Sequence, residues 1–154
     1  MALSAIKLGE HFSLSEMVQS ETALRRGIPN TPNEDQIENL GRLVSGLLEP
    51  IRELLGCPIH INSGFRSVHL NSVIGGAMGS AHTEGRAADI VPVGVDLKCA
   101  FDEIRNSTLP IDKVIFECNA WIHIQIARKG DKPRGLAYTA SGGPGAWKYE
   151  LVEG

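Results

Sequence analysis

The chain has 154 residues, of which 42% are hydrophobic and 21% charged, and this composition predicts a globular protein rather than a disordered or fibrous one. Its 15 Lys and Arg residues against 18 Asp and Glu residues give a formal net charge of -3, so it lacks the basic excess that binds nucleic-acid phosphates. We therefore expect a single domain over residues 1–154, with no nucleic acid among its partners.

The N-terminus has neither the basic start nor the apolar stretch of a secretory signal, and no apolar run approaches the roughly 18 residues that cross a bilayer. We expect synthesis in the cytoplasm without a signal peptide, and no membrane insertion. The three cysteines, Cys57, Cys99 and Cys118, match no Cys-x-x-Cys pattern. We expect reduced thiols and assign them no role.

Two helices are predicted in the first third of the chain. Ser13 is a good N-cap for a helix over about residues 14–26, which the segment 27–30 (Gly-Ile-Pro-Asn) ends. A second helix begins after Thr31 and continues to residue 55, because apolar residues recur at three- and four-residue steps: Ile37, Leu40, Val44, Leu47, Leu48, Ile51, Leu54 and Leu55. Pro50 lies inside it and predicts a kink near residues 46–50.

Strands are predicted at residues 59–63 and 87–91, where apolar and small residues dominate. The segment 64–86 between them is rich in Gly, Ser, His and Asn, and we expect a functional loop there. Asp96 caps a further predicted helix, whose apolar face carries Leu97, Ala100, Phe101 and Ile104.

A hairpin is predicted from strands at 111–117 and 121–127, which only three residues separate. Side chains alternate along the second strand, so Ile122, Ile124 and Ile126 share one face while Trp121, His123 and Gln125 share the other. The isoleucines are expected in the core, which directs His123 to the opposite face. Residues 128–134 are predicted to form a charged turn, and residues 147–152 a terminal strand or arm.

Three side chains form a candidate metal site: His82, Asp89 and His123. The turn around Gly85 can bring the His82 imidazole and the Asp89 carboxylate together, and His123 adds a second nitrogen. Three protein ligands with a fourth position left to water are typical of catalytic zinc, whereas structural zinc normally has four. One zinc per chain, used for hydrolysis, is the expectation; each residue alone also fits a turn cap or a half-buried polar side chain.

Two further residues fit hydrolytic chemistry. Glu117 ends the strand that pairs with the His123 strand, so it can accept the proton of a zinc-activated water and return it to the leaving amine. The planar fork of Arg66 can hold a substrate carboxylate or the developing oxyanion. The plainer alternatives are a surface carboxylate and an ion-pair partner. The other histidines, His11, His60 and His69, are assigned no role.

Three segments, taken in this order, resemble one known family: Ser63-Gly64-Phe65-Arg66, the stretch from Ser80 to Asp89, and Trp121-Ile122-His123. The family is that of the zinc D-alanyl-D-alanine carboxypeptidases and endopeptidases of peptidoglycan, which includes small phage lysins and shares its metal site with the hedgehog signalling domain. The resemblance covers about residues 11–127. It implies that His82, Asp89 and His123 bind zinc and that Arg66 and Ser80 contact substrate.

The resemblance also bears on the catalytic base. In one branch the glutamate lies three residues before the last histidine, where this chain has Ala120; in the hedgehog-like spacing it lies six before, where this chain has Glu117. The second pattern applies here. Some relatives carry another histidine at the position of Trp121, where it helps to stabilise the transition state; this chain departs from that pattern, and whether Trp121 takes over the role stays open. The implied fold is α+β, a small antiparallel sheet with the zinc site on one face and helices packed on the other.

The expected function is therefore that of a zinc-dependent peptidase, a single domain that hydrolyses a bond in peptidoglycan stem peptides or cross-links. We expect a monomeric phage or prophage endolysin that acts on the cell wall after release from the host cytoplasm. Which bond is cut stays open. The alternative is a non-catalytic, zinc-containing cell-wall-binding or virion module, and a third possibility is a purely structural metal.

Overall fold

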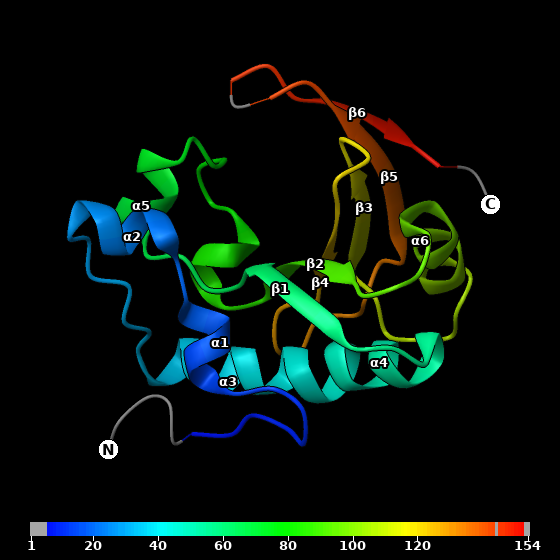
Figure 1. The fold of residues 1–154 in the computed structure, drawn as a ribbon, viewed down its shortest axis with the longest axis horizontal. Helices are drawn as coiled ribbons and strands as arrows, with labels where there is room; N and C mark the ends of the chain where they lie inside the picture. Colours follow the sequence, from blue (N-terminus) through cyan, green and yellow to red (C-terminus); the bar gives the residue numbers. More distant parts are fainter. Residues whose placement is uncertain (1–5, 144, 153–154) are drawn as a thin grey trace.

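The computed structural model describes residues 6–143 and 145–152. It contains a six-stranded sheet in the order β1-β2-β4-β3-β5-β6, with the long helical segment on one side (Figure 1). The strands are β1 (Ile59–Ser63), β2 (Ala87–Pro92), β3 (Lys113–Glu117), β4 (Trp121–Gln125), β5 (Leu136–Ser141) and β6 (Lys148–Leu151). The predicted α+β class is confirmed, although β3 and β5 pair in parallel while the other neighbours are antiparallel.

The helices follow the capping signals of the sequence. They are α1 (Leu14–Val18), α2 (Glu21–Arg26), α3 (Glu34–Leu43), α4 (Glu49–Leu55), α5 (Val68–Val73) and α6 (Leu97–Arg105), with a π-helical segment η2 (Val44–Leu48) and a 3₁₀ helix η3 (Ala81–Glu84). None of the helices in the described parts of the chain is long and apolar enough to cross a membrane.

The prediction of one helix over residues 14–26 was wrong. Helix α1 ends at Val18, because Gln19 and Ser20 have extended backbone angles. The Ser20 hydroxyl then accepts a hydrogen bond from the Ala23 backbone N–H at 3.1 Å and caps α2. A second N-cap inside an apparently continuous pattern thus divides the segment into two short helices.

Helices α3 and α4 form one continuous rod with the π-helical segment η2 between them. Pro50 lies in the first turn of α4. It has no N–H to donate to the carbonyl four residues earlier, and its ring clashes with that carbonyl, so a regular α-helical turn is disfavoured there. At the predicted kink, near residues 46–50, the structure has a π-helical segment within a continuous helical rod. Leu40, Leu47 and Ile51 of this rod are completely buried against the sheet.

The alternation along β4 separates the core from the other face of the sheet, as predicted. Ile122 and Ile124 are fully buried in the hydrophobic core with the α3–α4 rod and α6. His123 lies between them in sequence, and its neighbours across the sheet are Asp89 of β2 and Ile115 of β3. Since side chains of one strand alternate, His123 faces away from that core.

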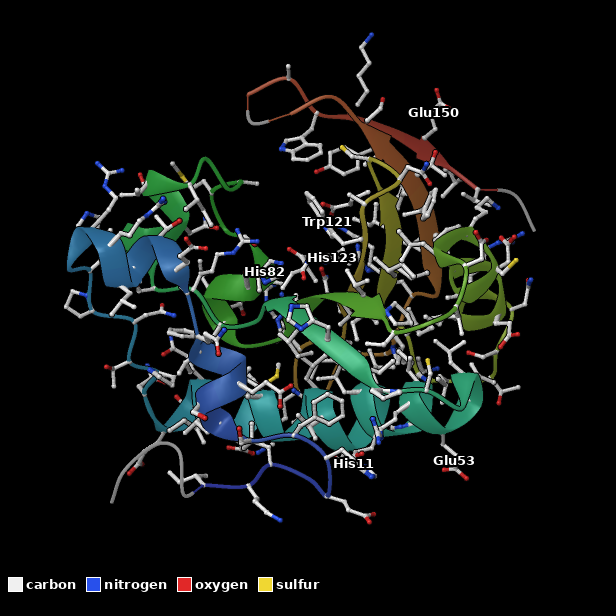
Figure 2. The ribbon with its side chains drawn as sticks, in the orientation of Figure 1. His11, Glu53, His82, Trp121, His123 and Glu150 are labelled. Atoms are coloured by element: carbon white, nitrogen blue, oxygen red, sulfur yellow. The ribbon has the colours of Figure 1, made fainter. Side chains whose placement is uncertain are left out.

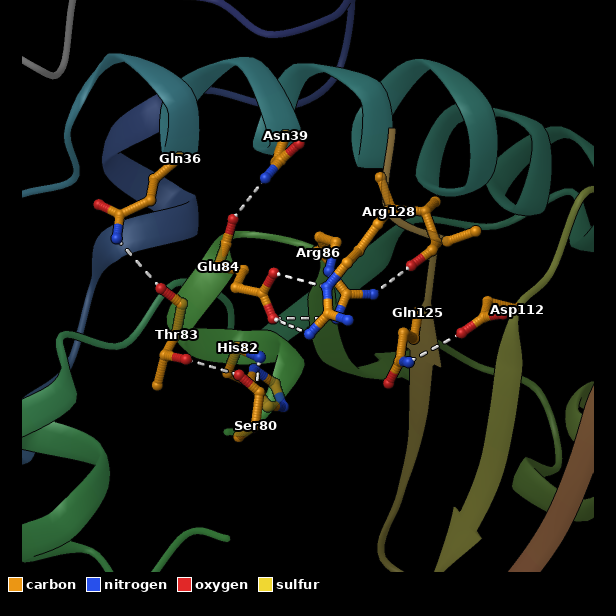
Figure 3. A network of polar contacts seen from close by, with 12 residues as sticks. Gln36, Asn39, Ser80, His82, Thr83, Glu84, Arg86, Asp112, Gln125 and Arg128 are labelled. Carbon is orange, nitrogen blue, oxygen red and sulfur yellow. Dashed lines mark hydrogen bonds and ion pairs between the residues drawn. The ribbon is translucent and has the colours of Figure 1, made fainter. Parts of the chain in front are cut away.

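The segment 64–86 is more structured than the predicted loop. It contains α5, which Ser67 caps, and η3, which Ser80 caps. Two side chains of α3 hold η3 in place: the Gln36 amide donates to the Thr83 carbonyl at 3.1 Å, and the Asn39 amide donates to the Glu84 carbonyl at 2.8 Å (Figure 3). The core rod therefore positions the segment that carries His82.

The C-terminal part was predicted only in part. Strand β6 corresponds to the expected terminal strand, but β5 was not predicted, and together they extend the sheet beyond β3 (Figure 1). Asp112 fixes the connection that leads into β5. Its carboxylate accepts two bonds from the Arg134 guanidinium, at 2.9 and 2.8 Å, and a third from the Arg134 backbone N–H at 3.2 Å.

This pair makes stability depend on pH. The Arg134 guanidinium, with help from Gln125, lowers the pKa of the buried Asp112 carboxyl to about 2 from an ordinary value of 3.8. A lowered pKa stabilises the fold above about pH 4, by on the order of 2 kcal/mol, and that contribution is lost as the pH falls from about 4 to 2. Urea unfolding of Asp112→Asn is expected to show a deficit of this size at pH 7 that shrinks over this range. A deficit that is equal at pH 7 and pH 2 would contradict this assignment.

Candidate active site

Three buried side chains from different elements meet on the face of the sheet opposite the core (Figure 2). His82 comes from η3, Asp89 from β2 and His123 from β4. Asp89 Oδ1 lies 3.2 Å from His82 Nε2 and 3.1 Å from His123 Nδ1. The ligand atoms of the three residues all lie within 4.8 Å of one another, which is close enough to hold one metal ion.

The hydrogen bonds of the two imidazoles show that this donor set suits a cation. His82 Nδ1 lies 2.8 Å from the Gly64 carbonyl oxygen, which only accepts, so Nδ1 carries the proton and Nε2 presents a lone pair. His123 Nε2 lies 3.1 Å from the Gln125 side-chain oxygen, which leaves the lone pair of Nδ1. When both rings are neutral, two nitrogen lone pairs and a carboxylate converge on one point; a proton on His123 Nδ1 can form the hydrogen bond to Asp89, and a metal ion would take its place. This is the N, N, O ligand set of catalytic zinc sites.

The charges at this point also attract a cation. Burial alone would raise the pKa of the Asp89 carboxyl, but the two imidazoles outweigh it and hold this pKa well below its ordinary value. Burial lowers the pKa of His82 and favours its neutral ring. At His123 burial acts in the same direction, but the hydrogen bond to Asp89, with the charges of Asp89 and Glu117, raises its pKa overall. The Asp89 carboxylate therefore stays charged, and a metal ion can replace the proton that His123 shares with it.

Glu117 lies at the end of β3, on the same face as the metal-site residues. It pairs with Trp121 across the hairpin, and the Trp121 indole N–H donates to Glu117 Oε2 at 2.8 Å. Burial, followed by the negative charge of Asp89, raises the pKa of Glu117 above its ordinary value. A buried carboxylate with a raised pKa and one oxygen held in place suits general acid–base chemistry.

Arg66 is held mainly by neighbouring side chains. Its guanidinium donates to Ser63 Oγ at 3.0 Å, to Asn71 Oδ1 at 2.8 Å and to Asp89 Oδ2 at 3.3 Å. These contacts use three of its five N–H groups. Arg66 thus orients the second oxygen of Asp89 and keeps part of its fork for a ligand. Asn71, five residues after Arg66, was not among the predicted site residues.

A cleft of about 780 Å³ opens over these residues. Its lining includes all the predicted site residues: Arg66, Ser80, His82, Asp89, Glu117 and His123. One wall comes from the segment around α5, and the other from the β5–β6 hairpin, which contributes Trp147 and Tyr149 (Figures 1 and 2). Ser80 has its hydroxyl toward the His82 backbone N–H, at 3.2 Å, so it caps η3 at the edge of this cleft.

Gly64 supports the His82 imidazole and tolerates no side chain. A Cβ at this position would lie 2.3 Å from the Met17 carbonyl oxygen. Gly64→Ala is therefore expected to shift the carbonyl that orients His82 and to lower the free energy of unfolding by about 1–3 kcal/mol. Gly41→Ala in α3, where a Cβ meets nothing within 4 Å, is the matched control, and it is expected to stabilise the fold slightly. Thermal unfolding measures both; equal stability of the two variants would contradict the prediction.

The remaining histidines lie outside this cleft. His11 pairs with Glu49, with Nδ1 and Oε1 2.7 Å apart, so it has a partner that the sequence did not reveal. His60 and His69 are exposed. Within the described residues, the only group of three or more His, Cys, Asp or Glu side chains close enough to hold a metal is His82, Asp89 and His123.

Comparison with known proteins gives one family. The model of the Peptidase M15 family matches residues 10–125, a range that includes the three candidate ligands, Glu117 and Arg66. No curated protein matches the chain. Peptidases of this family are zinc-dependent, and the buried His-Asp-His cluster is able to bind a metal. The chain belongs to the peptidase M15 family and is a metallopeptidase.

Proposed function

We propose that this protein is a single-domain zinc peptidase that hydrolyses a peptide bond in the stem peptides or cross-links of bacterial peptidoglycan. His82, Asp89 and His123 are the zinc ligands, with one zinc per chain. Glu117 is the catalytic base, and Arg66 and Ser80 contact the substrate. The activity is of the carboxypeptidase or endopeptidase type, and the protein acts as a phage or prophage endolysin.

One observation carries this proposal. Two imidazole lone pairs and a carboxylate converge at the floor of a cleft that also contains a buried carboxylate, Glu117, with a raised pKa. A structural metal needs no such neighbour and is usually enclosed by four protein ligands. An open cleft with an acid–base group beside the metal ligands is the arrangement that hydrolysis requires.

The chain's own residues have distinct tasks in this reaction. When bound, zinc lowers the pKa of a coordinated water to roughly 7 and polarises the scissile carbonyl. The Glu117 carboxylate accepts the proton of the attacking water and then donates it to the leaving amine nitrogen, so its charge is restored at the end of the cycle. The Trp121 indole holds one Glu117 oxygen, at 2.8 Å, and leaves the other to move the proton.

Arg66 and Ser80 bind and orient the substrate from the α5 side of the cleft. The Arg66 side chain is 12% exposed and keeps N–H groups beyond those bonded to Ser63, Asn71 and Asp89. These groups can hold a substrate carboxylate or the oxygen that gains charge in the transition state. Ser80 lies at the edge of the same cleft, where its hydroxyl can meet the peptide backbone.

Digestion of purified peptidoglycan tests the proposal and identifies the bond. Mass spectrometry of the soluble products is expected to show either free D-alanine, from a carboxypeptidase, or shortened or uncross-linked stem peptides, from an endopeptidase. The matched controls are the chelated protein, and the chelated protein with zinc restored. Zinc-dependent products are the supporting result.

Two further results separate the alternatives. Zinc bound with no product from Gram-negative or Gram-positive walls would favour the non-catalytic wall-binding or virion module. For the endolysin role, the pure monomeric protein added to cells with a permeabilised outer membrane is expected to lyse them, while cytoplasmic expression without a membrane-permeabilising partner is expected to leave cells intact. If the protein cuts isolated walls but does not lyse permeabilised cells, the proposed endolysin role is wrong and the proposed peptidase activity stands.

A further inference from the structure

A chain of hydrogen bonds leads from His123 away from the cleft. His123 Nε2 lies 3.1 Å from Gln125 Oε1, and Gln125 Nε2 donates to Asp112 Oδ2 at 3.0 Å. Asp112 in turn accepts two bonds from the Arg134 guanidinium. Figure 3 shows the contact between Gln125 and Asp112. Gln125 and Asp112 are 7% and 4% exposed, so water does not compete freely for these bonds.

The donor and acceptor groups in this chain of hydrogen bonds allow only one donor-to-acceptor direction. Asp112 is a carboxylate, because the bidentate Arg134 pair favours its charged form, and a carboxylate only accepts. The Gln125 NH₂ group must therefore face Asp112, which turns the Gln125 oxygen toward His123. An amide oxygen also only accepts, so His123 Nε2 must carry the ring proton. The opposite amide orientation would place the Gln125 oxygen against the Asp112 carboxylate.

We propose that Gln125, held by Asp112 and Arg134, is a positioning residue that selects which nitrogen of His123 binds the metal. Because Nε2 carries the ring proton of the neutral imidazole, Nδ1, 3.1 Å from Asp89 Oδ1, is left as the nitrogen that can bind a metal. In the other tautomer a proton on Nδ1 would occupy the metal position. The inference rests on the proposed metal site but not on the reaction or the substrate.

The tautomer of His123 is the direct test. In long-range ¹H–¹⁵N NMR spectra of the zinc-loaded protein, His123 is expected to show a protonated Nε2 and a metal-bound Nδ1. A protonated Nδ1 would overturn the proposal whatever the variants do. This readout is independent of hydrolysis, so it separates failure of the inference from failure of the proposed function.

Zinc affinity, measured by competition with a chelator, tests the role of the hydrogen bonds through Gln125 and Asp112. Gln125→Met removes the acceptor, and Asp112→Asn lets the Gln125 amide turn over. Each is expected to weaken zinc binding about 10- to 100-fold, with the fold checked by circular dichroism. Asp131→Asn, in the same connection and exposed, is the control and should leave the affinity unchanged. Wild-type affinity in both test variants would overturn the proposal.

Exchanging the amide and the carboxylate between positions 125 and 112 gives the most specific test. In the double variant Gln125→Glu/Asp112→Asn, the carboxylate introduced at position 125 accepts from His123 Nε2 and from the amide introduced at position 112. The donor-to-acceptor direction of the hydrogen bonds is thereby restored, so the double variant is expected to recover most of the zinc affinity that Asp112→Asn loses. A merely structural role of Asp112 predicts no recovery, and that outcome would overturn the proposal.

Discussion

Asp89→Ala is expected to abolish zinc binding and to destabilise the metal-free protein. In the proposed site Asp89 is the oxygen ligand; its Oδ1 lies 3.2 and 3.1 Å from the two imidazoles, and its Oδ2 pairs with Arg66 at 3.3 Å. Its removal takes away the carboxylate that pairs with the Arg66 guanidinium, which is 12% exposed, and breaking a buried pair from one side costs about 3–5 kcal/mol. Metal analysis and urea unfolding measure the two effects.

Asp102→Ala is the control for this variant. Asp102 forms ion pairs with Lys98 and Arg105 on α6, and its side chain is 37% exposed. Surface pairs of this kind contribute little, so we expect one zinc per chain and nearly unchanged unfolding. If Asp89→Ala still bound one zinc with wild-type affinity, the three-residue metal site would be wrong.

Glu117→Gln is expected to keep the metal and lose the activity. The amide has the same shape and can still accept the hydrogen bond from Trp121, but it cannot take a proton from water, so kcat/KM should fall by about 10²–10⁴-fold. Glu103→Gln, at an exposed position on α6, is the matched control and should retain full activity. Zinc content and peptidoglycan hydrolysis are measured on the same preparations. Substantial activity in Glu117→Gln would assign the base to another residue.

The alternation of side chains along β4 was the part of the site that the sequence predicted best. Ile122 and Ile124 lie in the core, and His123 lies on the opposite face beside Asp89. This succeeded because a strand has a period of two, so one strong apolar face determines where every other residue points. The convergence of His82 depended on a longer segment, and the sequence supported it mainly through the family resemblance.

The residues that hold the site in place were harder to predict. Asn71 orients Arg66 from five residues further along the chain, and Asp112 orients Gln125 from thirteen residues earlier. Gln125 was placed on the correct face by alternation but was given no role, because its task depends on Asp112 and Arg134. No local pattern encodes such contacts; only the spacing of two residues between His123 and Gln125 was available as a signal.

Strand β5, part of the second wall of the cleft, was not predicted, for a physical reason. Strand β5 pairs in parallel with β3, and a parallel neighbour brings no tight hairpin turn that a sequence could reveal. The β5–β6 hairpin lies outside residues 10–125, the range of the family match, yet Tyr138, Trp147 and Tyr149 line the cleft. The resemblance therefore indicated the metal site but not the full binding surface.

The most direct test of the central claim is X-ray diffraction from crystals of the zinc-loaded protein, collected on both sides of the zinc absorption edge. We predict a single anomalous peak per chain, about 2.0–2.2 Å from His82 Nε2, an Asp89 oxygen and His123 Nδ1. A peak at any other place, or no peak in crystals that contain one zinc per chain by metal analysis, would contradict the assignment of these three residues as the metal site.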